Sequence, residues 1–516
     1  MKIERTKNAT KNIIFGLILK LYQILVPFAI RTVMIKFLGI EYLGLNSLFT
    51  SILQVLNLAE LGIGSAMVFS MYKPIAIDDN EKICALMNLY KLYYRIIGLI
   101  VLIIGLVICP FVPYLIKGEL PAGMNVYVLY LLNLLATVFS YWLFAYKNSI
   151  LQAHQRQDVI SKVTLTVNTI QYILQIIAIC LFRNYYLYVV LLLLAQIVIN
   201  IYTAYKSNKL YPHFRAEGKL AKSEIKEINQ RVKDLFTAKL GSVIINSADS
   251  IVISAFLGLN TLAIYSNYYY IMNAIIVILA VVYNAILASI GNSLVTENID
   301  KNHNDFMIFT FGNNWLVGWG SVCLLCLYQP FMEIWMGRDM MFPFSIVIIF
   351  TVYFYSWMFN KIGNTYKNAA GMWREDFWKP YVSSVVNLIL NIILVNTIGI
   401  SGVLISTIVA TVFIETPWET YVLYKYMFKR SVFSYIKQLC SGVVVTILSM
   451  IVTYSICSMI FLENIVLVFI IRMIICFIVP NIIYILCFCR TKEFSLVICK
   501  VKSILQNKIS KKVLEI

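Results

Sequence analysis

The stretch "LKLYQILVPFAIRTVMIKFLG" at Leu19–Gly39 decides the fold class of this chain. Its residues are almost all apolar, and its length matches the roughly 20 residues that an α-helix needs to cross a bilayer. Two cations, Lys20 and Arg31, nevertheless lie within it. A cation at the centre of a membrane helix costs roughly 2.5–3.5 kcal/mol. The stretch therefore predicts a membrane helix whose two cations face polar surroundings instead of lipid.

The composition of the whole chain is that of a membrane protein. Of its 516 residues, 60% are hydrophobic and only 13% are charged, and the mean hydropathy is +0.80. Soluble domains carry about 25% charged residues. The net charge of +18 would suggest nucleic-acid binding in a soluble chain, but in a membrane protein it reflects Lys and Arg in cytoplasmic loops. We therefore expect an all-α polytopic membrane protein with no nucleic-acid partner.

Apolar runs of about 20 residues occur fourteen times along the chain. They begin near Asn12, Asn46, Tyr90, Met124, Val159, Tyr186, Phe236, Ser266, Asp305, Phe344, Tyr381, Gly402, Tyr435 and Ile465. With the N-terminus in the cytoplasm, the outer loops contain only three of the 43 Lys and Arg residues, namely Lys117, Arg183 and Arg338. This asymmetry predicts about fourteen transmembrane helices with both termini in the cytoplasm. The first run is too long and too interrupted by charge for a cleavable signal peptide.

Three short motifs recur at a nearly constant offset. The triplet FLG occurs at 37–39 and 256–258, an offset of 219 residues. The triplet YKN occurs at 146–148 and 366–368, and each copy leads into a charged loop. The pair YK occurs at Tyr205 and again at Tyr424. Because each pair falls on matching helices, the motifs predict two parallel six-helix repeats, an arrangement in which transporters place substrate between the halves.

The repeat predicts the following organisation. An N-lobe at 1–210 holds the first six helices, and a cytoplasmic amphipathic linker at 211–235 leads to a C-lobe at 236–430. Two further helices at 431–490 lie outside the repeat, and a basic cytoplasmic tail follows at 491–516.

The cations of the first helix form a stripe that the second half repeats. Lys20 and Arg31 are eleven residues apart, so they differ by only about 20° around an α-helix. Adding 219 to Lys20 gives Lys239, in the first helix of the second half, where Asn246 continues the polar stripe. We expect these faces to line a central cavity in which Arg31, Lys20 and Lys239 bind an anion. The alternative for both lysines is a cation that reaches the membrane interface.

Acidic residues also fall within predicted spans. Glu60 lies in "LNLAELGIG", Asp249 lies at the edge of the second polar stripe, and Glu415 and Glu419 flank Pro417. Such acids pair with cavity cations or carry a coupling proton or sodium ion. The alternative is an internal ion pair that only orders the helix bundle.

No motif indicates a cofactor, a metal or an enzyme. The eleven cysteines lie mostly in apolar runs, including a CxxC at Cys323 and Cys326, and we expect them to act as small apolar residues. The phosphate-binding motif G-x-x-x-x-G-K-[ST] is absent, so the chain does not hydrolyse nucleotide itself. The predicted outer loops are short, which disfavours a membrane glycan polymerase.

Longer stretches resemble a known family. "PFAIRTVMIKFLGIEYLGLNSLFTSILQVLNLAELGIGSAM" at 27–67 resembles the first two helices of bacterial polysaccharide flippases. "NSADSIVISAFLGLNTLAIYSNYYYI" at 246–271 resembles the start of their second lobe. These flippases belong to the multidrug/oligosaccharidyl-lipid/polysaccharide exporter (MOP) superfamily.

The resemblance implies two six-helix lobes, a V-shaped cavity lined by cations and two extra C-terminal helices. It implies a polyprenyl-diphosphate-linked oligosaccharide as substrate, moved to the outer leaflet of the bacterial cytoplasmic membrane. The family's basic residues in the first and seventh helices correspond to Lys20, Arg31 and Lys239. The counterpart of Arg31 in the second repeat is Ser250, so this chain departs from the pattern there.

Three functions follow from these observations. The leading hypothesis is a lipid-linked oligosaccharide flippase that works as a monomer among membrane lipids, with proton or sodium coupling carried by Glu60 or Asp249. The second is a cation-coupled drug or metabolite antiporter of the same superfamily, for which an acidic cavity is expected. The third is the glycan polymerase.

Overall fold

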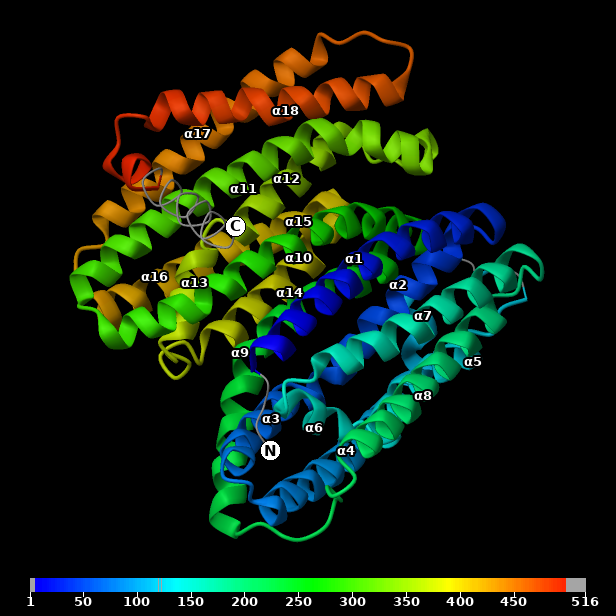
Figure 1. The fold of residues 1–516 in the computed structure, drawn as a ribbon. Helices are drawn as coiled ribbons and strands as arrows, with labels where there is room; N and C mark the ends of the chain where they lie inside the picture. The colour runs from blue at the N-terminus through cyan, green and yellow to red at the C-terminus, as the bar shows by residue number, and fades with distance from the viewer. Residues whose placement is uncertain (1–4, 119, 122, 498–516) are drawn as a thin grey trace, which may run out of the picture. The chain divides into compact units, whose positions relative to one another are not determined.

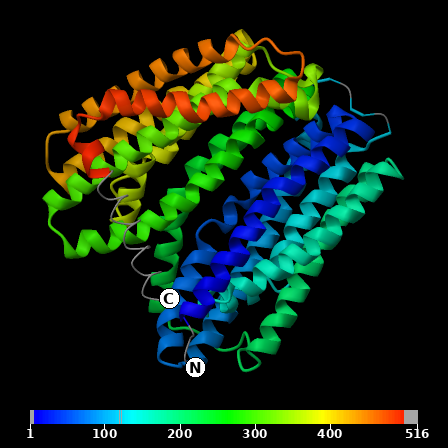
Figure 2. The ribbon, with the colours of Figure 1, turned by 45° about the horizontal axis from the view of Figure 1, so that its top comes forward.

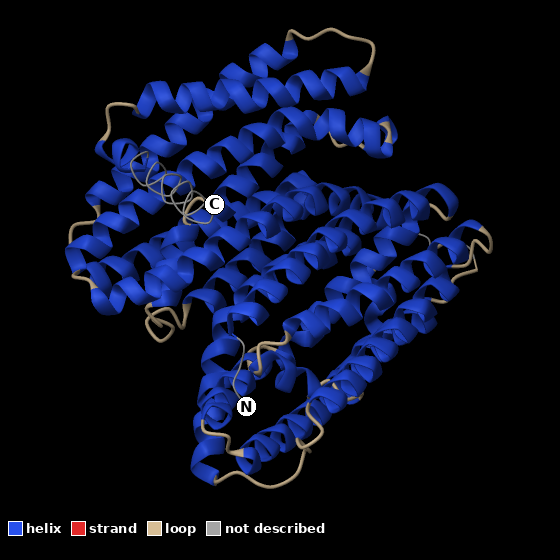
Figure 3. Ribbon diagram, viewed as in Figure 1, coloured by secondary structure: helices blue, strands red, loops and turns tan. Residues whose placement is uncertain are grey.

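The computed structural model describes residues 5–118, 120–121 and 123–497. In these residues the chain forms helices joined by short loops, and no strand occurs among them (Figure 3). The chain divides into two compact units, residues 1–266 and 267–516.

Among its described residues, the first unit contains nine helices and the start of a tenth (Figure 1). They are α1 (Arg5–Phe37), α2 (Ile40–Leu56), α3 (Ile63–Ala76), α4 (Asn80–Ile108), α5 (Val126–Trp142), α6 (Lys147–Ala153), α7 (Gln157–Cys180), α8 (Tyr185–Leu210), α9 (Lys222–Leu257) and α10 (Leu259–Thr296), with short 3₁₀ segments η1 (Asn57–Glu60) and η2 (Cys109–Leu115). Helix α1 packs along α7, which packs along α8, and α2 packs along α9. Figure 2 shows α1 in dark blue beside the cyan helices of the same unit.

The second unit is built around one long helix. It contains the rest of α10, α11 (Ile299–Met336), η3 (Arg338–Met340), α12 (Phe344–Met358), α13 (Lys361–Ala369), α14 (Lys379–Ile398), α15 (Ile400–Val409), η4 (Ala410–Glu415), α16 (Thr416–Val422), η5 (Leu423–Phe428), α17 (Phe433–Ser458) and α18 (Ile465–Phe488). Helix α11 packs against α12, α17 and α18, and α14 packs against α15. The segments η4 and η5 are π-helical.

The helices agree with the expected membrane spans. Twelve helical segments of the described residues are long and apolar enough to cross a bilayer, and α5 with α6, bent by 57°, would make a thirteenth. The apolar part of α9 at Val243–Leu257 is shorter and matches the remaining predicted span. The segments follow the fourteen predicted runs in order, and the all-α polytopic membrane fold is confirmed.

The expected linker differs from the structure in one respect. Its amphipathic part and the next span form a single helix, α9, which runs from Lys222 to Leu257. Helix α9 packs against α2 and α3, so it belongs to the first unit, which ends at Ser266 inside α10. The six-helix lobes with a linker at 211–235 therefore stay a prediction.

The repeated FLG triplet marks two equivalent junctions. Gly39 follows α1 with φ at 129°, and Gly258 follows α9 with φ at 91°. Positive φ favours glycine because it has no Cβ. Each glycine ends one helix and allows the next to start one residue later, at Ile40 or Leu259. The repeat in sequence is thus also a repeat of backbone conformation.

Candidate functional site

The two predicted cations of α1 differ in exposure and in position along the helix. Lys20 is exposed, whereas Arg31 is half-buried and its Nη1 donates a hydrogen bond to the Ser266 hydroxyl over 3.1 Å. The eleven residues between them correspond to about 16 Å along an α-helix. Arg31 is therefore oriented by the start of α10, while Lys20 lies about three turns nearer the N-terminal end of the chain.

The start of α1 is attached to the loop before α7. The Asn12 side-chain Nδ2 donates to the Gln155 backbone carbonyl over 2.9 Å, and the Asn12 side-chain Oδ1 accepts from the Asp158 backbone N–H over 2.8 Å. These two bonds attach the N-terminal part of α1, before Lys20, to a charged loop of the same unit.

The predicted residues of α9 are placed only in part. The side chains of Lys239 and Asn246 lie outside the described residues, so their part in a site stays a prediction. Asp249 is completely buried. Its neighbour Ser247 donates to the Gln54 side chain over 3.4 Å, which joins α9 to α2. Asp249 is thus buried within the first unit, where a carboxylate must either be paired with another group or be protonated.

Glu60 lies where a membrane span is interrupted. The span 40–76 changes from α2 to the 3₁₀ segment η1 and then to α3, and Glu60 is the last residue of η1. The Tyr94 hydroxyl donates to Glu60 Oε1 over 2.7 Å, and the Tyr90 hydroxyl donates to that of Tyr94 over 2.6 Å. The Tyr141 hydroxyl donates to Asn57 Oδ1 over 2.7 Å. Interrupted helices in membranes occur where backbone is buried in protein or lines a polar cavity.

Gly62 makes this interruption compatible with α9. Its φ is 87°, and a Cβ placed there would lie 2.7 Å from Leu235 Cβ. A Cβ at that distance would force a neighbour to shift, so both the backbone conformation and the close approach of α9 favour glycine. The backbone beside Glu60 therefore depends on glycine at this position.

The second unit contains a buried network of four charges, two of each sign. The side chains of Lys367 and Asp376 form an ion pair, as do those of Lys379 and Glu419. Lys379 Nζ also lies 2.9 Å from Asp376 Oδ2, and Lys367 Nζ lies 3.7 Å from Glu419 Oε1. All four side chains are at most 7% exposed. Because the charges balance, the network offsets part of its own desolvation.

Amides complete the environment of Glu419. Asn360 donates to its Oε2 over 2.9 Å and Asn364 to its Oε1 over 2.6 Å. The Tyr435 hydroxyl in turn donates to Asn360. Both carboxylate oxygens are thus satisfied, Oε2 by Asn360 directly before α13 and Oε1 by Asn364 of α13 and Lys379 of α14.

Glu415 lies at the end of the π-helical segment η4, directly before Thr416 and Pro417. The Ser383 hydroxyl donates to Glu415 Oε1 over 2.9 Å. A second π-helical segment, η5, follows α16. π-Helical turns inside α-helices occur frequently at functional sites. The span 400–428 is therefore irregular on both sides of Glu419.

The first unit has buried charged residues at the same places in the repeat. Lys147 follows Tyr146 as Lys367 follows Tyr366, and Lys147 is buried. Asp158 is also buried, and Arg156 Nε donates to its carboxylate over 2.9 Å. That bond raises the pKa of Arg156, so the guanidinium stays charged.

The sequence predicts a charged loop after each YKN triplet but does not assign these loops to a site. The signal was available, because the pattern R-x-D follows both triplets, at Arg156–Asp158 and at Arg374–Asp376. What the sequence did not show is that Glu419 reaches the second loop.

The predicted site residues thus have contacts on different helices. Arg31 contacts α10, Glu60 contacts α4, and Glu415 contacts α14. Arg31 places a cation on α1, whereas Glu60 and Glu415 place carboxylates within or next to hydrogen-bonded irregular segments. Such carboxylates are suited to bind a proton or a small cation.

Comparisons with known proteins complete these observations. A family model described as polysaccharide biosynthesis protein matches residues 9–288. No protein of curated function matches the sequence.

Three solved structures are similar in fold. Lipid II flippase MurJ in an inward closed conformation has a TM-score of 0.66 and 18% identity over 92% of this chain and 98% of that chain. A multidrug resistance MATE family transporter of the MOP superfamily, facing inward, has a TM-score of 0.63 and 15% identity over 79% of this chain and 97% of that chain. A MOP superfamily transporter from Pyrococcus furiosus has a TM-score of 0.53 and 13% identity over 82% of this chain and 97% of that chain. At these identities the likeness establishes the fold.

Proposed function

Because the chain belongs to the polysaccharide biosynthesis protein family and has the fold of the MOP superfamily, we propose that it is a flippase for a polyprenyl-diphosphate-linked oligosaccharide. It moves this lipid from the inner to the outer leaflet of the bacterial cytoplasmic membrane by alternating access, for export of cell-surface polysaccharide. It is a transporter and not an enzyme, works as a monomer and keeps both termini in the cytoplasm.

Arg31 is the observation that carries this proposal. It is a half-buried guanidinium within an apolar membrane helix, and its Nη1 donates a hydrogen bond to the Ser266 hydroxyl. A planar guanidinium binds phosphate oxygens through two parallel N–H···O bonds, and such charge-assisted bonds are about twice as strong as neutral ones. A diphosphate is the anionic group of the proposed substrate, so Arg31 supplies the charge and the geometry to hold it.

Lys20 and Lys239 extend this role. Lys20 is exposed on α1, about 16 Å from Arg31 along the helix axis. A lysine binds phosphate as a point charge on a flexible stem, which suits a first contact better than fixed positioning. We propose that Lys20 captures the diphosphate, Arg31 holds it, and Lys239 assists from α9, with Asn246 hydrogen-bonding to the sugars.

The acids have a separate role in the proposal. Glu60 accepts a hydrogen bond from Tyr94, and Asp249 is completely buried. A buried carboxylate that gains and loses a proton or sodium ion changes its own desolvation energy, and this change can drive a conformational step. We propose that Glu60 and Asp249 couple transport to an ion gradient, and that Glu415 acts at the irregular span of the second unit.

A drug or metabolite antiporter is the second candidate. Two features favour it: the buried acid Asp249, and a likeness in fold to a multidrug resistance MATE family transporter. Arg31 and Lys20 argue against it, because cations repel the positively charged compounds that an acidic cavity would select.

Translocation by the reconstituted chain tests the proposal. Vesicles with the glycan lipid in the inner leaflet are probed from outside with a glycosidase that cannot cross the bilayer. We expect the wild type to expose the glycan much faster than protein-free vesicles do, and Arg31→Ala to remove most of this activity. Lys36→Ala is the matched control, since Lys36 is an exposed cation of the same helix. Equal exposure with and without protein would refute the proposal, and gradient-driven uptake of a cationic dye by the same vesicles would favour the antiporter.

A further inference from the structure

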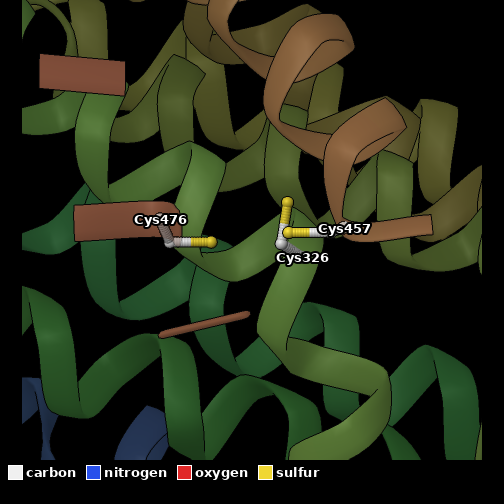
Figure 4. Close-up of side chains that lie close together, drawn as sticks. All are labelled: Cys326, Cys457 and Cys476. Atoms are coloured by element: carbon white, nitrogen blue, oxygen red, sulfur yellow. The ribbon is translucent and has the colours of Figure 1, made fainter. Parts of the chain in front are cut away.

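Three cysteines that are far apart in the sequence meet inside the second unit. Cys326 of α11, Cys457 of α17 and Cys476 of α18 have sulfur atoms that all lie within 4.8 Å of one another (Figure 4). Each of the three residues is at most 1% exposed. The cluster therefore joins the two C-terminal helices to the central helix of this unit.

The surroundings of the cluster are apolar and fixed. Leu327, Met450 and Ile475 pack against it, together with Cys323, which precedes Cys326 by one helical turn. The Trp319 indole donates to the Cys476 carbonyl over 2.8 Å, which fixes the cysteine backbone of α18 to α11. The three thiols are thus held by helices that cannot easily separate.

A cation lies beside the cluster. Arg472 precedes Cys476 by four residues, so the two side chains lie on one face of α18. Its Nη1 lies 3.4 Å from the Cys326 carbonyl, and among the described residues its buried Nε has no hydrogen-bond partner. A guanidinium inside a membrane is costly unless an anion compensates it. Thiolates at this place would provide that negative charge.

The spacing of the sulfur atoms is compatible with a metal site that uses all three thiols. Zinc–sulfur bonds of about 2.3 Å in a tetrahedral site separate the sulfur atoms by about 3.8 Å, so small rotations of the side chains suffice. A disulfide needs one pair at about 2.05 Å and leaves the third thiol without a role. Three convergent thiols also match the preference of soft metal ions for sulfur ligands.

We propose that Cys326, Cys457 and Cys476 form a binding site for a soft metal ion of the zinc or monovalent copper class. Each thiol gives up its proton to solvent as the metal–sulfur bond forms, and Arg472 compensates the negative charge of the thiolates. The bound ion ties α17 and α18 to α11. This inference stands on the thiol cluster alone and does not depend on the substrate of the transporter.

Cadmium binding tests this site. The purified full-length chain in detergent is reduced, desalted without oxygen and titrated with Cd²⁺, whose thiolate complexes absorb in the ultraviolet. We expect one tightly bound Cd²⁺ per chain with a thiolate band, and loss of both in Cys326→Ala/Cys457→Ala. The control variant Cys440→Ala/Cys487→Ala/Cys489→Ala removes exposed cysteines only and should keep the band. Equal bands in the wild type and in the Cys326→Ala/Cys457→Ala variant would overturn the proposal.

Two further measurements make the result independent of how well the variants fold. Saturating Cd²⁺ should slow alkylation of Cys326, Cys457 and Cys476 in the wild type, as mapped by mass spectrometry of the peptides. Unchanged alkylation of all three would overturn the proposal. A disulfide between any two of them in the chain purified without reductant would overturn it as well.

Discussion

Arg31 of α1 donates a hydrogen bond from its Nη1 to the hydroxyl of Ser266 on α10, over 3.1 Å. The two residues are 235 positions apart, so this bond joins the first helix of one predicted repeat to the second helix of the other. The bond orients the guanidinium at one of its nitrogen atoms. The proposed function rests on this orientation.

Ser266→Ala tests whether orientation matters apart from charge. The substitution keeps Arg31 but removes its hydroxyl partner, and a hydrogen bond of this kind contributes about 0.5–1.5 kcal/mol. We expect the translocation rate in proteoliposomes to fall about 2- to 10-fold, with only a small loss of thermal stability. The translocation rate of Arg31→Lys should lie between those of Ser266→Ala and Arg31→Ala. Lysine keeps the positive charge of arginine but lacks its two parallel N–H donors. A Ser266→Ala rate equal to that of the wild type would show that the bond has no functional role.

Glu419→Ala should unfold at a much lower temperature than the wild type. The substitution leaves Lys379 buried with one acid fewer, and removing one partner of a buried ion pair costs about 3–5 kcal/mol. Thermal unfolding in detergent measures the change. The double variant Lys379→Met/Glu419→Leu removes both charges and should recover part of the loss.

Glu333→Ala is the matched control for this network. Its partner Arg338 is 83% exposed, so the pair contributes at most about 1 kcal/mol. If Glu419→Ala and Glu333→Ala had the same melting temperature, the buried network would not stabilise the second unit.

Gly62→Ala should destabilise the first unit by about 1–3 kcal/mol. The added Cβ would stand 2.7 Å from Leu235 Cβ, on a backbone with φ at 87°. Gly312→Ala on α11 is the control, since its Cβ would meet no atom within 4 Å and alanine favours helix. Melting temperatures of both variants measure the difference, and a stable Gly62→Ala would mean that α9 does not approach η1 as closely as described.

Acidification should weaken the first unit through His154. Burial against the rings of Tyr211 and Phe214 lowers the pKa of His154, although the Ile150 carbonyl and Asp78 act in the opposite direction. Because the folded-state pKa lies below the unfolded one, the unfolded chain binds the proton more readily. The stability contribution is therefore complete above the ordinary histidine pKa of about 6.5 and is lost as the pH falls through the lowered value.

Melting temperatures at about pH 7.5 and about pH 5 measure this effect. The wild type should lose more stability between the two values than His154→Gln, which cannot titrate. An equal loss in both proteins would assign the acid sensitivity to other groups.

Much of the fold was predictable, because lipid imposes strict requirements. Backbone polar groups in hydrocarbon must be satisfied within a helix, so long apolar runs such as the one at 14–37 become helices. The FLG repeat also predicted equivalent helix junctions at Gly39 and Gly258. The boundary at Phe236 was not found in the structure, because no helix-breaking residue separates the amphipathic segment from the span and α9 continues through it.

The buried clusters were not predictable, because they depend on packing between distant helices. Hydropathy showed that Cys326, Cys457 and Cys476 lie in apolar runs but not that they meet. The contact of Glu419 with the loop after the second YKN triplet was equally hidden. Of the expected site residues, Arg31, Glu60 and Glu415 have defined partners, whereas Lys239 and Asn246 have side chains outside the described residues.

Native mass spectrometry of the purified chain, released gently from detergent, tests the central claim most directly. We predict a co-purified polyprenyl-diphosphate glycan on the wild type and on Lys36→Ala, and its loss in Lys20→Ala/Arg31→Ala. The mass of the adduct would identify the sugars. Bulk phospholipid alone, equal in amount on all three proteins, would contradict an anion site on α1 and with it the flippase proposal.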